Sequence, residues 1–343
     1  MSLETIIAII TLASLIIYAL MGGADFGGGV WDLLAQGRRA ERQRNVIADA
    51  IAPIWEANHV WLILVIVLLF TAFPRAFALM MTALHIPLTA MLLGIVARGS
   101  AFVFRKYDSK DDKVQRRWTR LFGISSAVTP FLQGMCLGAL ASGAIRVEGS
   151  RLLTGYLAGW TGPFAIACGF FALGLFTYLA AVYLTVDARD DSEVQNDFRR
   201  RAIVSGLALA PLSAFVFFVA REGGATYMFE GLTRWWAPWL LGGTTLFALL
   251  ALGALWQRRF IFARTMAIGQ VALILIGWAV AQYPDLIIPD VTIGNAAAPA
   301  ITLKLLVGAL ALGALILFPS LYYLFRVFKG RPGEKPVDNE RSE

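Results

Sequence analysis

Charged side chains are scarce in this sequence. They make up 15% of its 343 residues, whereas about 25% is usual in a soluble domain. Hydrophobic residues make up 58%. This balance excludes an ordinary soluble protein and predicts an all-α integral membrane protein, because long apolar runs cross a bilayer as helices.

Cysteine and histidine are rare as well. Cys136 and Cys168 are the two cysteines, and both fall inside apolar runs without a CxxC spacing, so neither a disulfide framework nor a metal site is expected. The two histidines, His59 and His85, fall near opposite ends of adjacent predicted helices. A haem ligated by both of them is therefore not expected.

Long connections are also missing. No segment between apolar runs exceeds about 20 residues, so the sequence has no room for an extramembrane domain. The net charge of +7 then reflects basic residues at a membrane face, and no nucleic-acid partner is expected. The glycine run at 27–29 follows no strand. It predicts close helix packing rather than a phosphate loop, because Gly23 and Gly27 are one helical turn apart.

Nine apolar runs are present, each long enough for the roughly 20 residues that a membrane span needs. They predict a polytopic membrane protein with nine transmembrane helices, arranged as two four-helix bundles plus one peripheral helix. We expect a single integral membrane domain over 1–330 and a polar cytoplasmic tail over 331–343. The predicted helices lie near 5–35, 46–73, 76–104, 118–143, 158–186, 202–220, 236–256, 262–282 and 300–326.

The lysines and arginines predict how these helices are oriented. Of the 30, 23 fall on the side reached after the first helix and five on the other side, with Arg98 and Lys304 inside helices. Basic residues concentrate at the cytoplasmic face of membrane proteins. The N-terminus is therefore expected in the periplasm and the C-terminus in the cytoplasm.

Polar residues enter the apolar run at 48–70, which reads ADAIAPIWEANHVWLILVIVLLF. Glu56 in this run and Asp25 in the first helix both lie about 16–18 Å from the cytoplasmic ends of their helices, at 1.5 Å per residue. Sequential helices are normally antiparallel neighbours, so the two acids are predicted at a similar depth. Acidic side chains inside a membrane commonly relay protons along a pathway. Asp25 and Glu56 are thus candidates for a proton pathway, with Asn58 and His59 in support.

Three classes of function remain open on these residues. A respiratory proton path and a proton-coupled secondary transporter both need paired acids, but the second half of the chain offers few deep charges for a transporter site. A pure scaffold would tolerate neutral residues at both acids. Arg98 lies deep enough to need a carboxylate or a haem propionate as its partner, unless its long side chain reaches the membrane face.

Four segments resemble subunit II of cytochrome bd-type terminal oxidases. The first two are MGGADFGGGVWDLL, similar to the family pattern D-G-F-D-x-G-x-G, and IAPIWEANHVWLI, similar to I-x-P-x-W-D-G-N-x-x-W-L. The others are FTAFPRAFA and ARGSAFVFR, similar to F-x-A-F-P-x-x-Y-A and F-R-G-x-A-F-x-[FY]-R. All four occur in family order within the first 105 residues, whereas the second half resembles the family mainly in hydropathy.

The resemblance implies a complex in the bacterial inner membrane. Its subunit I would carry two b-type haems and a d-type or further b-type haem, oxidise quinol and reduce dioxygen to water. Subunit II would bind no haem itself and would line a cytoplasmic proton path. Quinol, membrane lipid and small single-helix accessory subunits are the other partners that the resemblance implies.

Individual residues match the family motifs. Asp25 and Glu56 match the acids of the first and second helices, and Asn58 and Arg98 match motif positions around them. A structural quinone lies near the motif's tryptophan in some members, so its expected contacts here are Trp55 and Trp61. The departures are Gly22 in place of the first acid, Glu56 in place of Asp, Ala57 in place of Gly, and His59 where another residue is usual.

Overall fold

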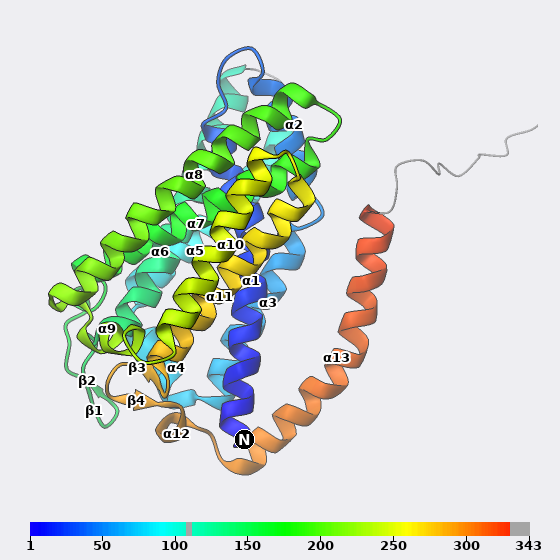
Figure 1. Cartoon of the computed structure of the whole chain (residues 1–343). Helices are drawn as coiled ribbons and strands as arrows, with labels where there is room; N and C mark the ends of the chain where they lie inside the picture. The colour runs from blue at the N-terminus through cyan, green and yellow to red at the C-terminus, as the bar shows by residue number, and fades with distance from the viewer. Residues whose placement is uncertain (108–111, 330–343) are drawn as a thin grey trace, which may run out of the picture. The chain divides into compact units, whose positions relative to one another are not determined.

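Helices make up nearly all of the structure (Figure 1), a computed structural model that describes residues 1–107 and 112–329. Four short strands form two hairpins, β1–β2 and β3–β4. The α-helices are α1 (Leu3–Leu33), α2 (Ala40–Ile51), α3 (Trp55–Ala72), α4 (Pro74–Ala83), α5 (His85–Tyr107), α6 (Asp112–Ser142), α7 (Pro163–Asp187), α8 (Ser192–Val219), α9 (Thr226–Leu232), α10 (Ala237–Trp256), α11 (Phe260–Gln282), α12 (Ile293–Ala296) and α13 (Ala300–Lys329). The π-helix η1 is Ala220–Gly224, and the strands are β1 (Val147–Glu148), β2 (Arg151–Leu152), β3 (Asp285–Ile287) and β4 (Val291–Thr292).

Nine helices within the described residues are long and apolar enough to cross a membrane, which confirms the predicted all-α polytopic fold. The chain falls into two compact units, 1–298 and 299–343, and α13 belongs to the second. The whole predicted tail, 331–343, lies outside the described residues, as does the connection 108–111 between α5 and α6. The division into two four-helix bundles plus a peripheral helix stays a prediction.

The first helix, α1, packs against α3, α6 and α7. Glycines let the backbones approach: a Cβ added at Gly27 would collide with the backbone carbonyl of Phe176 on α7, and one added at Gly23 would collide with Leu179. These contacts agree with the close packing that the spacing of Gly23 and Gly27 predicted. They bring the middle of α7 directly against the part of α1 that carries Asp25.

Two of the predicted helices are interrupted. The run 46–73 is divided into α2 and α3, with Pro53 between them, and the run 76–104 is divided into α4 and α5 at Leu84. Proline has no N–H for the helical ladder, and this explains both breaks: Pro53 stands in the first, and Pro87 cannot donate to the carbonyl of Ala83. The apolar character continues across each break, so hydropathy alone gave one run.

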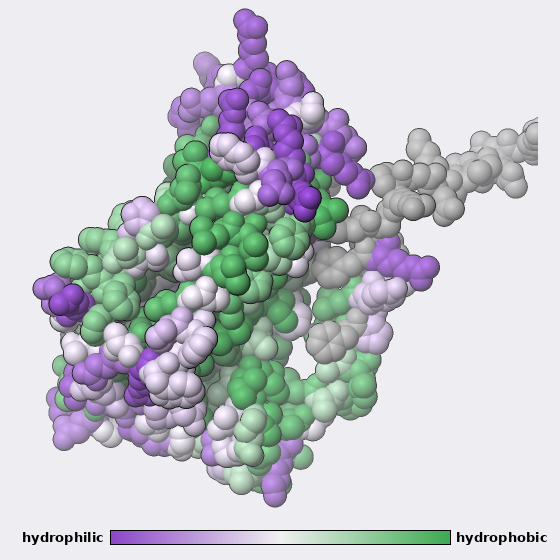
Figure 2. All heavy atoms as spheres, in the orientation of Figure 1, coloured by the Kyte–Doolittle hydropathy of each residue, from purple (hydrophilic) through white to green (hydrophobic). Residues whose placement is uncertain are grey.

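One end of the unit 1–298 is strongly basic. We call it the basic end; it comprises residues 34–51, 188–201 and 256–264. Figure 2 shows hydrophilic side chains gathered over α2 and a mainly hydrophobic flank beyond it. Two ion pairs join the start of α2 to the start of α8. Arg39, directly before α2, pairs with Asp197 at 2.8 Å, and Arg42 pairs with Asp191, directly before α8, at 2.5 Å. Asp191 also caps α8 by accepting from the Val194 N–H, which extends this helix ten residues before its predicted start at 202.

The opposite end carries both hairpins, and we call it the hairpin end. Arg146 pairs with Asp290 at 2.9 Å, and the same carboxylate accepts from the Val147 N–H at 2.8 Å. Arg75 donates to the carbonyl of Gly149 in the first hairpin at 2.8 Å. These bonds tie the segment after α6 to the segment after α11.

Candidate functional site

Asp25 is fully buried on α1 and is paired with Arg98 from α5. The Arg98 guanidinium donates to Asp25 Oδ1 and, at 3.2 Å, to the Asp25 carbonyl, while its Nε donates to Ser126 Oγ at 3.1 Å. It also lies 4.9 Å from the ring centroid of Phe26 and 5.0 Å from that of Phe122. Arg98 is 1% exposed, so its charge is balanced by the carboxylate and the ring faces rather than by water.

A second ion pair lies two helical turns further along the same two helices. Arg105 donates to both carboxylate oxygens of the buried Asp32, at 3.0 and 2.9 Å. Arg105 also lies over the Phe122 ring, at 5.2 Å from its centroid. Both partners are seven residues beyond those of the first pair. We call the two pairs the ion-pair ladder (Asp25–Arg98 and Asp32–Arg105).

The ladder was only partly visible in the sequence. Asp32 falls inside the predicted helix 5–35, but Arg105 falls one residue beyond the predicted helix 76–104. The signal that identifies it is the equal spacing, since Asp25 to Asp32 and Arg98 to Arg105 are both seven residues and both helices run in one direction. Such spacing brings successive pairs back to the same helix face.

Asn58 on α3 faces the same region of α1. Its side chain is fully buried, and a Cβ added at Gly22 would lie 3.3 Å from its Nδ2. Gly22 stands where the resembled family has its first acid, and the missing side chain leaves this space to Asn58. Neither amide atom of Asn58, nor Oδ2 of Asp25, makes a hydrogen bond of good geometry within the described residues, although the Asn58 side chain is close enough to act on the Asp25 carboxylate.

His59 is the next residue of α3 after Asn58. Its Nδ1 lies 2.7 Å from the carbonyl oxygen of Trp55, and its ring meets Phe26 edge-on at 6.4 Å between centroids. The other ring nitrogen, Nε2, is buried and has no partner in the described part of the chain. His85, in contrast, lies against Tyr156 at the hairpin end, so the two histidines do not face one haem.

Glu56 lies level with the Asp25 region of α1 but points away from it. The first turn of α3 is level with Gly22 and Phe26 on α1, as the contacts of Asn58 and His59 show. The Glu56 side chain is exposed, and the structure does not bring it to Asp25. Residues two apart on a helix point to different sides, so with Asn58 turned inward Glu56 faces outward.

The two tryptophans pack against other side chains of this chain, Trp61 buried and Trp55 half-buried. Trp55 lies 6.1 Å from the Phe102 ring centroid, and Trp61 is buried. An apolar groove of about 460 Å³ runs between α1, α3 and α11 near the hairpin end; its lining includes Leu12, Val65 and Trp278 but neither Trp55 nor Trp61.

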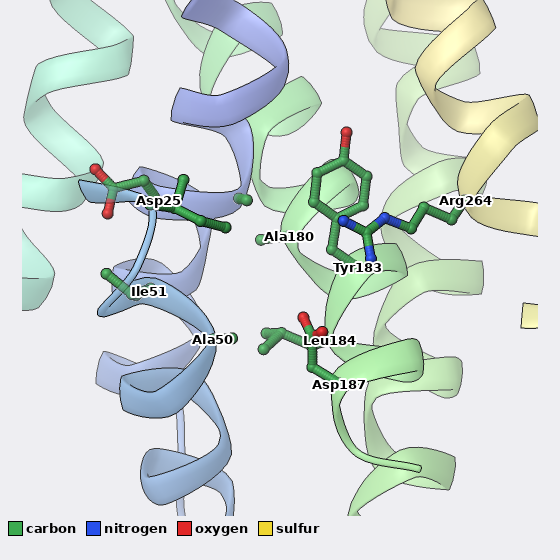
Figure 3. A pocket seen from close by; sticks show the side chains of 10 residues that line it. Asp25, Ala50, Ile51, Ala180, Tyr183, Leu184, Asp187 and Arg264 are labelled. Carbon is green, nitrogen blue, oxygen red and sulfur yellow. The ribbon is translucent and has the colours of Figure 1, made fainter. Parts of the chain in front are cut away.

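A cavity of about 10 Å³, room for about one water molecule, lies behind Asp25 between α1, α2, α7 and α11. Figure 3 shows Tyr183 and Arg264 on its far side, with Asp187 nearby, whereas the Asp25 carboxylate points away from them. The Arg264 guanidinium lies 4.6 Å from the Tyr183 ring centroid. The cavity therefore adjoins α1 at Asp25 without reaching toward the carboxylate oxygens.

Family comparison covers almost the whole chain. The family model for cytochrome bd terminal oxidase subunit II matches residues 3–328. The chain belongs to this family. The match therefore includes the second half of the chain, where the sequence motifs are faint. Membership of the family favours the oxidase over the secondary transporter.

Relatives in several bacteria agree. The chain is 23% identical over 339 residues to a putative cytochrome bd menaquinol oxidase subunit II of Bacillus subtilis, covering 95% of this chain and 96% of that one. It is 28% identical over 204 residues to the cytochrome bd-I ubiquinol oxidase subunit 2 of Escherichia coli, covering 59% and 52%. The fold matches the structure of bd oxidase from Geobacillus thermodenitrificans with a TM-score of 0.76 at 22% identity, over 96% of this chain and 99% of that chain.

This bd oxidase subunit II is thus a multi-pass membrane protein and part of a quinol:oxygen oxidoreductase complex. Membership implies a subunit I as partner and haems in that partner. The relatives are named for different quinols, so similarity alone does not select the electron donor.

Proposed function

We propose that this chain is the haem-free subunit II that supports the haem-bearing subunit I and lines a path for cytoplasmic protons. One observation carries the proposal. A fully buried acid, Asp25, keeps one carboxylate oxygen without a described partner, next to a buried Asn58 and a buried histidine nitrogen. Unpaired polar atoms are costly inside a membrane and mark proton or ion paths more often than packing sites.

Glu56 would connect this chain to its partner. Its carboxylate is exposed on the chain alone, at the level of the buried site, so a neighbouring subunit could accept a proton from it. In this proposal the path passes the Asp25 region and Glu56 and ends at the oxygen-reducing haem of subunit I, which would also hold the other haems and the quinol site.

The remaining assignments are part of the same proposal. The complex would lie in the bacterial inner membrane with the N-terminus in the periplasm and the C-terminus in the cytoplasm, which the 23 to 5 distribution of basic residues supports. A structural quinone at Trp55 and Trp61, bound lipid and single-helix accessory subunits rest on the resemblance alone.

The test replaces each acid by its amide in the intact complex. Both variants keep the size of the side chain: Asp25→Asn removes a buried negative charge from the path, and Glu56→Gln removes an exchangeable proton. Oxygen consumption should fall by roughly the 10²–10⁴-fold typical of a lost acid–base group, while Glu56→Asp, the residue usual in the family, keeps most of the rate. Glu148→Gln, in the exposed first hairpin, is the control.

The haem spectrum must show full assembly of each variant. An assembled Glu56→Gln complex that consumes oxygen at the unaltered rate would remove Glu56 from the path, and the same result for Asp25→Asn would remove the proposal.

A further inference from the structure

His59 is held in one tautomer. Its Nδ1 lies 2.7 Å from the Trp55 carbonyl oxygen, which can only accept a hydrogen bond, so Nδ1 carries a proton in the neutral ring. The neutral ring then presents an unprotonated Nε2. That atom is buried and has no described partner. A nitrogen lone pair in this condition can accept a proton.

The charged groups around His59 suit an added positive charge. From α1 the nearby acid is Asp25, which directly precedes Phe26, whose ring meets His59 edge-on. From α5 comes Arg98, but it is already bound to Oδ1 of the same carboxylate. On α3 itself the nearest acid is Glu56, one turn earlier and exposed. Asn58, between them, is neutral.

Asp25, for its part, is held in place by Arg98. Arg98 donates to both its side chain and its carbonyl, so the carboxylate is held in one position beside a guanidinium. The pair is also enclosed by the rings of Phe26 and Phe122. Asp25 can thus serve as a fixed counter-ion while a neighbouring group changes its charge.

We propose that His59 is the side chain that takes up and releases the proton at this depth, with Asp25 as its counter-ion. The inference rests on the proposed proton path. The step moves one proton and no electrons: Nε2 accepts the proton, the resulting imidazolium keeps its Nδ1–H bond to Trp55, and Nε2 then releases the same proton toward Glu56. Asn58 offers a donor and an acceptor beside the route.

An isosteric pair of variants tests this role. His59→Gln and His59→Glu have nearly the same shape, but only the glutamate can exchange a proton. We expect oxygen turnover of the intact complex to fall about 10²-fold in His59→Gln, at the lower end for a lost acid–base group, and to stay within about tenfold in His59→Glu. Reduction of the haems by quinol under anaerobic conditions should keep its rate in both, since it does not need the path.

The second histidine provides the matched control. His85 also faces a backbone carbonyl through Nδ1, that of Thr82 at 2.9 Å, but it lies at the hairpin end against Tyr156. His85→Gln should leave turnover unchanged. A haem spectrum identical to that of the unaltered complex establishes assembly for every variant.

The outcomes separate this inference from the proposal beneath it. Equal turnover in His59→Gln and His59→Glu, whether normal or reduced in both, would overturn the role of His59. If that occurs while Asp25→Asn and Glu56→Gln are slow, the path stands and another group carries the proton. If all four variants turn over normally, the path itself is wrong.

Discussion

At the scale of single residues, the buried Arg98 shows how far depth alone can guide a prediction. Its position in an apolar run required a partner for its charge, and the structure supplies Asp25. The direction of Glu56 could not be predicted in the same way. The side of α3 on which Glu56 lies depends on the residue at which α3 begins after Pro53. The hydropathy profile is continuous there and does not show where α3 begins.

Removal of Arg98 should strongly destabilise the protein. In Arg98→Gln the Asp25 charge would remain buried without its counter-ion, which costs about 3–5 kcal/mol in comparable buried pairs. The double variant Asp25→Asn/Arg98→Gln should recover most of this loss, because no charge is then left. Thermal unfolding of the purified complex measures both, with Arg221→Gln as an exposed control. A double variant less stable than Arg98→Gln would contradict the pairing argument.

At the scale of elements, small residues predicted close helix packing best. The glycines of α1 predicted a close neighbour, and α7 provides it. The identity of that neighbour was not predictable, since hydropathy says which helices cross a membrane but not which of them touch. The α2–α3 and α4–α5 breaks show the same limit.

Gly27→Val should disrupt the contact between α1 and α7. Its side chain would need the space of the Phe176 carbonyl, and a backbone atom cannot move aside without separating the helices. We expect a loss of at least the 1–3 kcal/mol typical of an overpacked core, seen as little assembled complex in membranes. Gly253→Ala on α10 is the control, because no described atom lies within 4 Å of its added Cβ. Normal assembly of Gly27→Val would show that the two helices are not in this contact.

The link between the hairpins should weaken in acid. Burial opposes the charge of Asp290, but hydrogen bonds from Arg146 and from the Val147 N–H outweigh it and lower the pKa of this carboxyl. A lowered folded-state pKa gives stability that is present above the unfolded value of about 3.9 and lost as the pH falls through the folded value. Hydrogen exchange of the β1 amides should therefore speed up below about pH 4.

Asp290→Asn should raise the same exchange rates at neutral pH. A partly exposed charged hydrogen bond contributes about 1 kcal/mol, or roughly fivefold in exchange. The variant should also lose the acid-dependent step. Persistence of that step in Asp290→Asn would assign it to another group.

At the scale of the whole molecule, charge distribution predicts which face meets the cytoplasm. Cysteines at Gln36 and Ser192 are exposed at the basic end, and one at Ser150 is exposed at the hairpin end. In intact cells an impermeant thiol reagent should label Ser150→Cys only, since native Cys136 and Cys168 lie within helices. Labelling at Gln36 and Ser192 but not at Ser150 would reverse the orientation.

The ion-pair ladder also fixes the axial register between α1 and α5. If α5 slid along α1 by one turn, neither arginine would lie opposite its carboxylate, and the charges would be left without partners. A slide of seven residues would restore one contact, Arg98 with Asp32, but would displace α5 by about 10 Å, a third of the hydrocarbon thickness. A displacement of that size would carry α5 out of register with the bilayer, and at the intermediate positions the charges would be unpaired. The two pairs thus fix one position of α5 along the axis of α1.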